Sequence, residues 1–184
     1  MARRWFVAAS LDAFIDAAET NQEFWRGVRR LARVDALLRA RARDVPGAWH
    51  LLCLAEDWCS DAVQALPVIA RLIEDAPAID LRVVGRDLNE DLMQAHLTRG
   101  TRSIPVVILL DGGFRECGWW GPRPSVLQAW HYEQGPKVEP AERLRYKREW
   151  YARDRGVSIA REVLELLETA AGVSGGSSPD ATGG

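Results

Sequence analysis

The sequence Trp58-Cys59-Ser60-Asp61 stands at the junction between two segments of different periodicity. Before it, residues 49–55 form a continuous apolar run as long as a buried strand. After it, apolar residues recur at helical spacing over residues 60–75. A cysteine at a strand-to-helix junction has the unpaired N–H groups and the positive dipole end of the helix aimed at its sulfur. Because this setting favours the thiolate and is expected to leave the sulfur exposed to a substrate, Cys59 is the predicted nucleophile.

A second segment, Ser103-Ile104-Pro105, opens the strongest predicted strand, residues 105–110. Together with the Cys59 segment it resembles the thioredoxin family, whose redox motif opens a helix and faces a cis-proline at the start of a later strand. The resemblance covers residues 48–130 and implies an α/β fold with a mixed central sheet flanked by helices. Three further matches support it: Pro67 in the predicted active-site helix, the turn Asp111-Gly112-Gly113, and Gly121.

Two departures from the family pattern concern the second half of its redox machinery. Ala62 occupies the position of the second, resolving cysteine, and Cys53 occupies that of the buried acid that serves it. The resemblance therefore implies one active-site thiol, Cys59, and no two-cysteine cycle. We do not expect Cys53 to resolve instead, because a strand-then-turn path does not bring its Cβ to disulfide geometry with Cys59.

The remaining site residues follow partly from the resemblance and partly from their positions. The resemblance implies that the backbone at Ile104, before a cis-Pro105, pairs with an extended substrate. Trp58, Trp119 and Trp120 are expected to form an aromatic rim, with either Trp119 or Trp120 in the core because neighbours on a strand face opposite ways.

The two polar residues after the cysteine each allow two interpretations. Ser60 either caps the helix or hydrogen-bonds the thiolate. Asp61 either stabilises the first helical turn or moves protons for the incoming thiol.

Three carboxylates, Glu56, Asp57 and Asp61, lie within a few residues of the thiol and oppose its ionisation. One close carboxylate can cancel a helix end that is worth about 0.3–1 kcal/mol. We therefore expect the Cys59 pKa to be only modestly lowered. Cations that could compensate are Arg99, Arg102 and Arg123.

The composition is that of an ordinary globular protein, with 184 residues, 47% hydrophobic and 27% charged. A net charge of −2 favours neither nucleic acid nor an anionic membrane as partner. Neither a membrane span nor a signal peptide is predicted, so the expected location is cytoplasmic. There Cys53 and Cys117 are expected to be buried free thiols. The three histidines are too widely spaced to predict a metal site.

The hydrophobic pattern predicts four regions. Residues 1–46 are expected to form an N-terminal helical extension, with Ser10 capping a first helix and a second helix over residues 21–43. The inward residues predicted for the second helix are Phe24, Val28, Leu31 and Leu38. The resemblance implies a thioredoxin-like core over residues 47–132, the helical spacing after it predicts a C-terminal helical extension over 133–171, and residues 172–184, rich in Gly and Ser, are expected to be a flexible tail.

The sequence thus predicts a monothiol thiol–disulfide oxidoreductase in which the Cys59 thiolate attacks a disulfide or oxidised thiol. An external thiol, such as glutathione or another low-molecular-weight thiol, would release the mixed disulfide, and no resident cofactor is expected. The partner would be a protein or small-molecule thiol or disulfide. The alternative is a thioredoxin-like protein-binding module without redox activity, in which the added helices form the functional surface.

Overall fold

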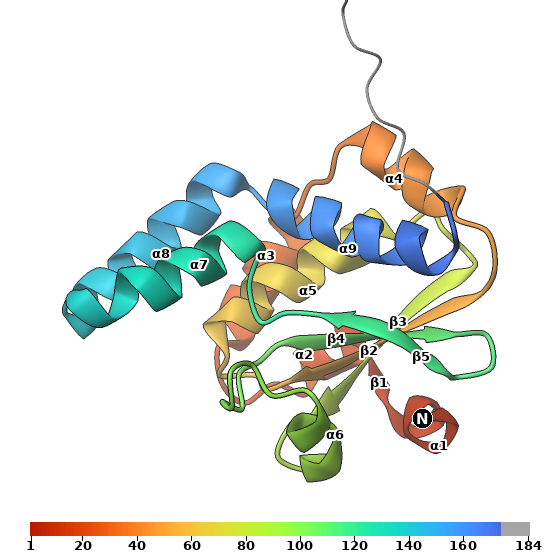
Figure 1. The fold of residues 1–184 in the computed structure, drawn as a ribbon, viewed down its shortest axis with the longest axis horizontal. Helices are drawn as coiled ribbons and strands as arrows, with labels where there is room; N and C mark the ends of the chain where they lie inside the picture. Colours follow the sequence, from red (N-terminus) through yellow and green to blue (C-terminus); the bar gives the residue numbers. More distant parts are fainter. Residues whose placement is uncertain (174–184) are drawn as a thin grey trace, which may run out of the picture.

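The computed structural model describes residues 1–173. Its centre is a five-stranded sheet in the order β1-β3-β2-β4-β5 (Figure 1). The strands are β1 (Ala9–Ser10), β2 (Trp49–Ala55), β3 (Ile79–Gly85), β4 (Val106–Asp111) and β5 (Glu116–Trp120). β2 pairs with β3 in parallel, and the other pairs are antiparallel. The predicted α/β architecture with a mixed sheet is confirmed.

Helices cover both faces of this sheet, which explains why β2 and β4 read as continuous apolar runs. One face carries α3 (Gln22–Leu31), α4 (Ala36–Arg43), α5 (Ser60–Leu72) and α9 (Val157–Ala170). The other carries α1 (Ala2–Val7) and α6 (Glu90–Ala95). The remaining helices are α2 (Leu11–Asp16), α7 (Ser125–Glu133), a 3₁₀ turn (Gly135–Lys137) and α8 (Pro140–Asp154).

The N-terminal region is more than a helical extension. Ser10 caps α2 as predicted, its Oγ accepting from the Ala13 N–H at 3.2 Å. Ser10 also ends β1, an edge strand that pairs with β3 and was not predicted. The single helix expected over residues 21–43 is two helices, α3 and α4. Ala32 adopts an extended conformation, and the Asp35 side chain caps the new helix by accepting from the Leu37 N–H at 2.8 Å.

The buried face of α3 also differs from the prediction. Leu38 of α4 is buried as expected, but Phe24 and Leu31 are exposed. The residue that enters the core is Trp25, which is fully buried and packs edge-on against Phe14. Its indole N–H donates to the Asp57 carbonyl at 2.9 Å, which ties α3 to the segment just before Cys59.

The C-terminal helices belong to the same packed body as the sheet. α9 buries Ile159, Val163, Leu164 and Leu167 against the core. The Glu168 carboxylate accepts two hydrogen bonds from Arg41 of α4, at 3.0 and 2.7 Å. α7 and α8 project together from one end of the molecule (Figure 1), joined by the stacked rings of Trp130 and Tyr146.

One cysteine departs from the expectation of burial. Cys117 lies exposed on the edge strand β5. The β4–β5 register pairs Leu109 with Gly118 and Leu110 with Glu116, so Cys117 is the extra residue of a β-bulge.

None of the helices within residues 1–173 has the length and apolar character needed to span a bilayer. Of the predicted tail, residues 172–184, all but the first two lie outside the described residues.

Candidate active site

Cys59 occupies the N-cap position of α5, directly after β2 and a short turn. Its thiol donates to the carbonyl oxygen of Ile104 at 3.4 Å. The Ile104–Pro105 peptide bond is cis, and Pro105 leads into β4. Because β4 pairs with β2, the strand that precedes Cys59, the sheet itself brings the two segments together.

The sulfur is more enclosed than the sequence predicted. Cys59 is only 7% exposed, and burial raises the pKa of its thiol. The backbone N–H groups of Ala62 and Asp61 and the charge of Lys147 lower this pKa, while the Asp61 carboxylate raises it. The balance is a raised pKa, so the expectation of an exposed sulfur with a modestly lowered pKa is wrong. The helix end acts as expected, but the loss of solvent outweighs it.

Asp61 is buried at the centre of a polar cluster formed with the C-terminal region. Its Oδ2 lies 2.8 Å from an Arg123 nitrogen and its Oδ1 lies 3.1 Å from Lys147 Nζ. The Tyr151 hydroxyl also donates to Oδ1 at 3.1 Å. Burial and the Asp61 charge together raise the pKa of Tyr151, which keeps the phenol protonated as a donor. The Asp61 carboxylate therefore holds α8 against the beginning of α5.

Ser60 is part of the same cluster. Its Oγ accepts from Lys147 Nζ at 3.0 Å, so one ammonium group contacts both residues that follow Cys59. Of the carboxylates near the thiol, Asp61 is the one whose charge acts on the Cys59 pKa. The Asp57 carboxylate accepts the N–H groups of Glu19 and Thr20, both at 2.8 Å.

A hollow of about 330 Å³ lies over Cys59. Its walls include Trp58, Ser60, Ile104, Arg86, Arg123 and Lys147. Trp58 is 48% exposed at the rim, and the Arg86 guanidinium lies 5.0 Å from the centre of its ring, a cation–π contact. The predicted site residues Trp58, Cys59, Ser60, Asp61 and Ile104 are thus brought together around one opening.

Trp120 does not line this opening. It is buried, and its indole N–H donates to Glu162 of α9 at 2.7 Å. The same carboxylate accepts the backbone N–H and the hydroxyl of Ser125, at 2.8 and 2.6 Å, at the beginning of α7. Trp120 is therefore a core residue that positions α7. Its neighbour Trp119 is half-buried and packs edge-on against His96.

Gly121 lies directly against the proline strand. Its φ is +131°, and a Cβ at this position would lie 2.1 Å from the Pro105 carbonyl oxygen. Only a residue without a side chain allows this close approach. Pro67 stands inside α5, eight residues after Cys59.

A sequence model described as Thioredoxin (Thioredoxin_9) matches residues 8–139. The chain belongs to the thioredoxin family. The match begins just before β1 and ends after α7. No curated protein matches the chain.

Two solved structures resemble this thioredoxin-family protein over most of its length. One is PA1234, a protein of unknown function from Pseudomonas aeruginosa, with 23% identity and a TM-score of 0.71; the match covers 92% of this chain and 97% of PA1234. The other is an HIV epitope scaffold with 20% identity and a TM-score of 0.71, covering 91% of this chain and 97% of the scaffold. At these identities the likeness concerns the fold alone.

Sequence reasoning missed Lys147 and Tyr151, the α8 residues that reach the thioredoxin-family site. Arg123 was considered, but as a partner of the sulfur, whereas its guanidinium pairs with Asp61. Arg102 pairs with Asp87 and Glu90, and Arg99 lies over the ring of Tyr132. The available signal was the spacing of Arg143, Lys147 and Tyr151, which puts all three on one helix face.

Within residues 1–173, no three side chains of His, Cys, Asp or Glu gather closely enough to hold a metal ion.

Proposed function

We propose that this protein is a thiol–disulfide oxidoreductase of monothiol type, with Cys59 as its nucleophile. The observation that carries the proposal is the position of the Cys59 sulfur at the N-terminus of α5, 3.4 Å from the carbonyl oxygen that precedes cis-Pro105. Helix N–H groups favour the thiolate, and the hollow over the sulfur gives a substrate access.

The reaction has two exchange steps. Cys59 gives its proton to solvent, and its thiolate attacks one sulfur of a disulfide R–S–S–R′. The new Cys59–S–S–R bond forms as the old S–S bond breaks, and R′–S⁻ leaves with the electron pair. A second thiolate, supplied from solution, then attacks the R sulfur and releases the Cys59 thiolate. The net result is that the external thiol replaces R′–S in the disulfide, and the oxidation state of the protein does not change.

The second thiol is proposed to be external because neither Cys53 nor Ala62 can supply it. Cys53 is fully buried within β2, and burial raises the pKa of its thiol. Ala62 offers no sulfur. The same proposal includes a cytoplasmic location, where small thiols are kept reduced, and no resident cofactor.

A second candidate, a thioredoxin-like binding module without redox activity, is favoured by one observation. Cys59 is 7% exposed and its pKa is raised, which reduces the amount of thiolate at neutral pH. In that case α7 and α8 would supply the functional surface.

Formation of a mixed disulfide distinguishes the two candidates. A Cys117→Ser background removes the exposed cysteine, and Cys53 is fully buried. This protein is incubated with bis(2-hydroxyethyl) disulfide, and its intact mass is measured before and after addition of a reducing thiol. The oxidoreductase gains one adduct that the thiol removes, while the Cys59→Ser variant of the same background gains none. If neither protein gains the adduct, the oxidoreductase proposal is refuted and the binding module is the candidate that is left.

A further inference from the structure

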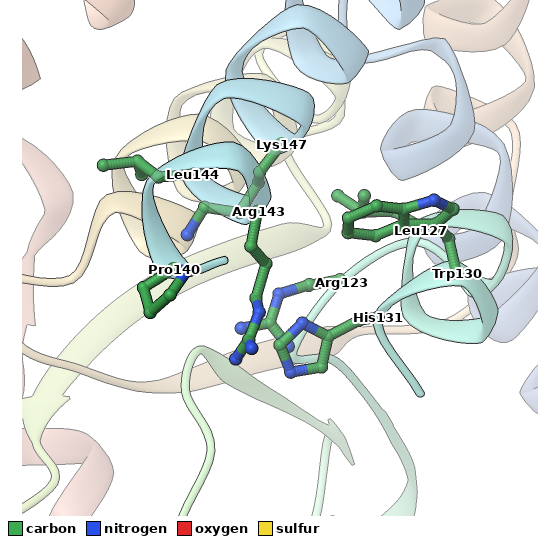
Figure 2. A pocket seen from close by; sticks show the side chains of 8 residues that line it. All are labelled: Arg123, Leu127, Trp130, His131, Pro140, Arg143, Leu144 and Lys147. Carbon is green, nitrogen blue, oxygen red and sulfur yellow. The ribbon is translucent and has the colours of Figure 1, made fainter. Parts of the chain in front are cut away.

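A second hollow, of about 220 Å³, lies between α7 and α8 beside the Cys59 site. Four of its walls are basic side chains, Arg123, His131, Arg143 and Lys147, and Leu127 and Trp130 are among the apolar ones. Figure 2 shows Arg143 reaching from α8 so that its guanidinium lies near that of Arg123 and the ring of His131. Gly135, in the turn between α7 and α8, lies beside both Arg143 and His131.

The charges around this hollow are not balanced. Arg123, Arg143 and Lys147 bring three positive charges, and Asp61 is the carboxylate that pairs with Arg123 and Lys147. Within residues 1–173, the Arg143 guanidinium forms no ion pair. Burial and the charges of Arg123, Arg143 and Lys147 lower the pKa of His131, and Asp61 offsets this only in part. The hollow therefore has an excess of positive charge.

The arginines also have hydrogen-bonding capacity to spare. The Nε–H groups of Arg123 and Arg143 are both buried, and neither has a hydrogen-bond acceptor in the described part of the chain. A buried donor without an acceptor costs free energy. A carboxylate or a phosphate offers a pair of acceptor oxygens that one guanidinium group binds with two parallel hydrogen bonds.

The two hollows share the side chains of Arg123 and Lys147 as common walls. A ligand bound to Arg143 and His131 would therefore be separated from the hollow over the thiol by the side chains of Arg123 and Lys147. Lys147 contacts Ser60 and Asp61, the residues that follow Cys59. The geometry favours a ligand with an acidic group at one end and a sulfur at the other.

We propose that the hollow lined by Arg123, His131, Arg143 and Lys147 binds the oxyanion, a carboxylate or a phosphate, of a small acidic thiol or disulfide whose sulfur reacts at Cys59. The anion site is independent of the chemistry at Cys59, whereas the delivery of sulfur rests on the proposed function. The exchange steps are those given above, with the acidic molecule as R–S–S–R′ or as the second thiol.

Binding is tested without the thiol chemistry, in the Cys59→Ser variant titrated with inorganic phosphate. The pKa of the His131 imidazole is followed by NMR of the ring protons. Phosphate is expected to raise it, because a bound anion offsets the surrounding positive charge. The rise is expected to be lost in Arg143→Gln and kept in Arg145→Gln, whose side chain is 70% exposed on the same helix. A His131 pKa that phosphate does not change, or changes equally in both variants, would overturn the anion site.

Delivery of the sulfur is tested by rates of mixed-disulfide formation at Cys59 in the Cys117→Ser background. The probes are glutathione disulfide, which carries carboxylates, coenzyme A disulfide, which carries phosphates, and the uncharged bis(2-hydroxyethyl) disulfide. Arg143→Gln is expected to slow the acidic probe that fits the site by about tenfold and to leave the uncharged probe unchanged. The probe that is slowed identifies the oxyanion.

The outcomes separate the two proposals. Equal slowing of charged and uncharged probes would mean a structural role for Arg143 and would refute the delivery of acidic thiols. Reaction with none of the probes, together with phosphate binding, would refute the proposed oxidoreductase and retain the anion site.

Discussion

Lys147 of α8 places its Nζ 3.1 Å from Asp61 Oδ1 and 3.0 Å from Ser60 Oγ, at the first turn of α5. A residue of the C-terminal region thus completes the electrostatic environment of Cys59. Its ammonium group has two effects of the same sign, because it lowers the Cys59 pKa directly and neutralises the carboxylate that raises it. The ionisation of the thiol is consequently coupled to the docking of α8.

Removal of this ammonium group is expected to make the thiol less reactive. Lys147→Met keeps the side-chain length and loses the charge, so the Cys59 pKa rises further. In the Cys117→Ser background, alkylation of Cys59 by iodoacetamide at pH 8 is expected to slow by about threefold. Arg148→Met, on the exposed face of the same helix, is the matched control and is expected to leave the rate unchanged. Equal rates for Lys147→Met and the parent would show that Lys147 does not influence the sulfur.

Asp61→Asn is expected to have opposite effects on reactivity and on stability. Loss of the negative charge lowers the Cys59 pKa, since the carboxylate raises it. The same change leaves Arg123 and Lys147, which are partly buried, without a counter-ion and costs about 2 kcal/mol of the free energy of unfolding. Urea denaturation and the pH profile of alkylation measure the two effects.

Asp91→Asn is the control for the stability measurement, because the carboxylate of Asp91 is 66% exposed in its ion pair with Arg4. It is expected to change the free energy of unfolding by less than about 1 kcal/mol. Unchanged stability in Asp61→Asn would contradict a structural role for the cluster.

Gly121 and Gly27 offer a contrast in backbone freedom. Gly121→Ala places a methyl group where the Pro105 carbonyl oxygen lies, at a φ of +131°. We expect a loss of at least about 2 kcal/mol in the free energy of unfolding. Gly27→Ala lies inside α3 with open space around it, and is expected to raise stability by about 0.5–1 kcal/mol. Thermal unfolding of both variants checks the comparison, and a tolerated Gly121→Ala would show that the contact with Pro105 is not fixed.

The sequence was most informative where local pattern and fold agree. The apolar run before Cys59 and the helical spacing after it are both properties of adjacent residues, and the structure has β2 and α5 at those places. That the Cys59 and Pro105 segments lie side by side was predicted from the family resemblance. In the structure, the pairing of β2 with β4 brings the two segments together.

The features that the sequence did not predict depend on partners far along the chain. The hydrogen bonds between Asp61 and Tyr151 and between Asp57 and Trp25 join residues far apart in the sequence, and hydrophobic periodicity does not predict such pairs. The buried side of α3 was misjudged because its apolar spacing favoured Phe24 over Trp25. Enclosure of the sulfur was missed for the same reason, since burial depends on what packs around the helix end.

Alkaline pH is expected to destabilise the protein through its two buried thiols. Burial raises the pKa of both Cys53 and Cys59 in the folded state, whereas in the unfolded chain a thiol ionises near pH 8.5. Above that pH the unfolded state binds fewer protons than the folded state, so the free energy of unfolding falls as pH rises. Each thiol contributes a slope of up to about 1.4 kcal/mol per pH unit. Below about pH 7 the thiols are protonated in both states and contribute no slope.

Substitution of the two cysteines separates this effect from other alkaline titrations. Urea denaturation between pH 7.5 and pH 10 is compared for the parent, Cys53→Ala and Cys59→Ser. Each substitution removes one group whose folded-state pKa is raised, so each variant is expected to lose less stability per pH unit than the parent. Cys117→Ser is the control, because this exposed thiol is not shielded from solvent by folding. A slope that persists undiminished in Cys59→Ser would mean that the sulfur ionises as readily in the folded chain as in the unfolded one, and that the enclosure of Cys59 opens in solution.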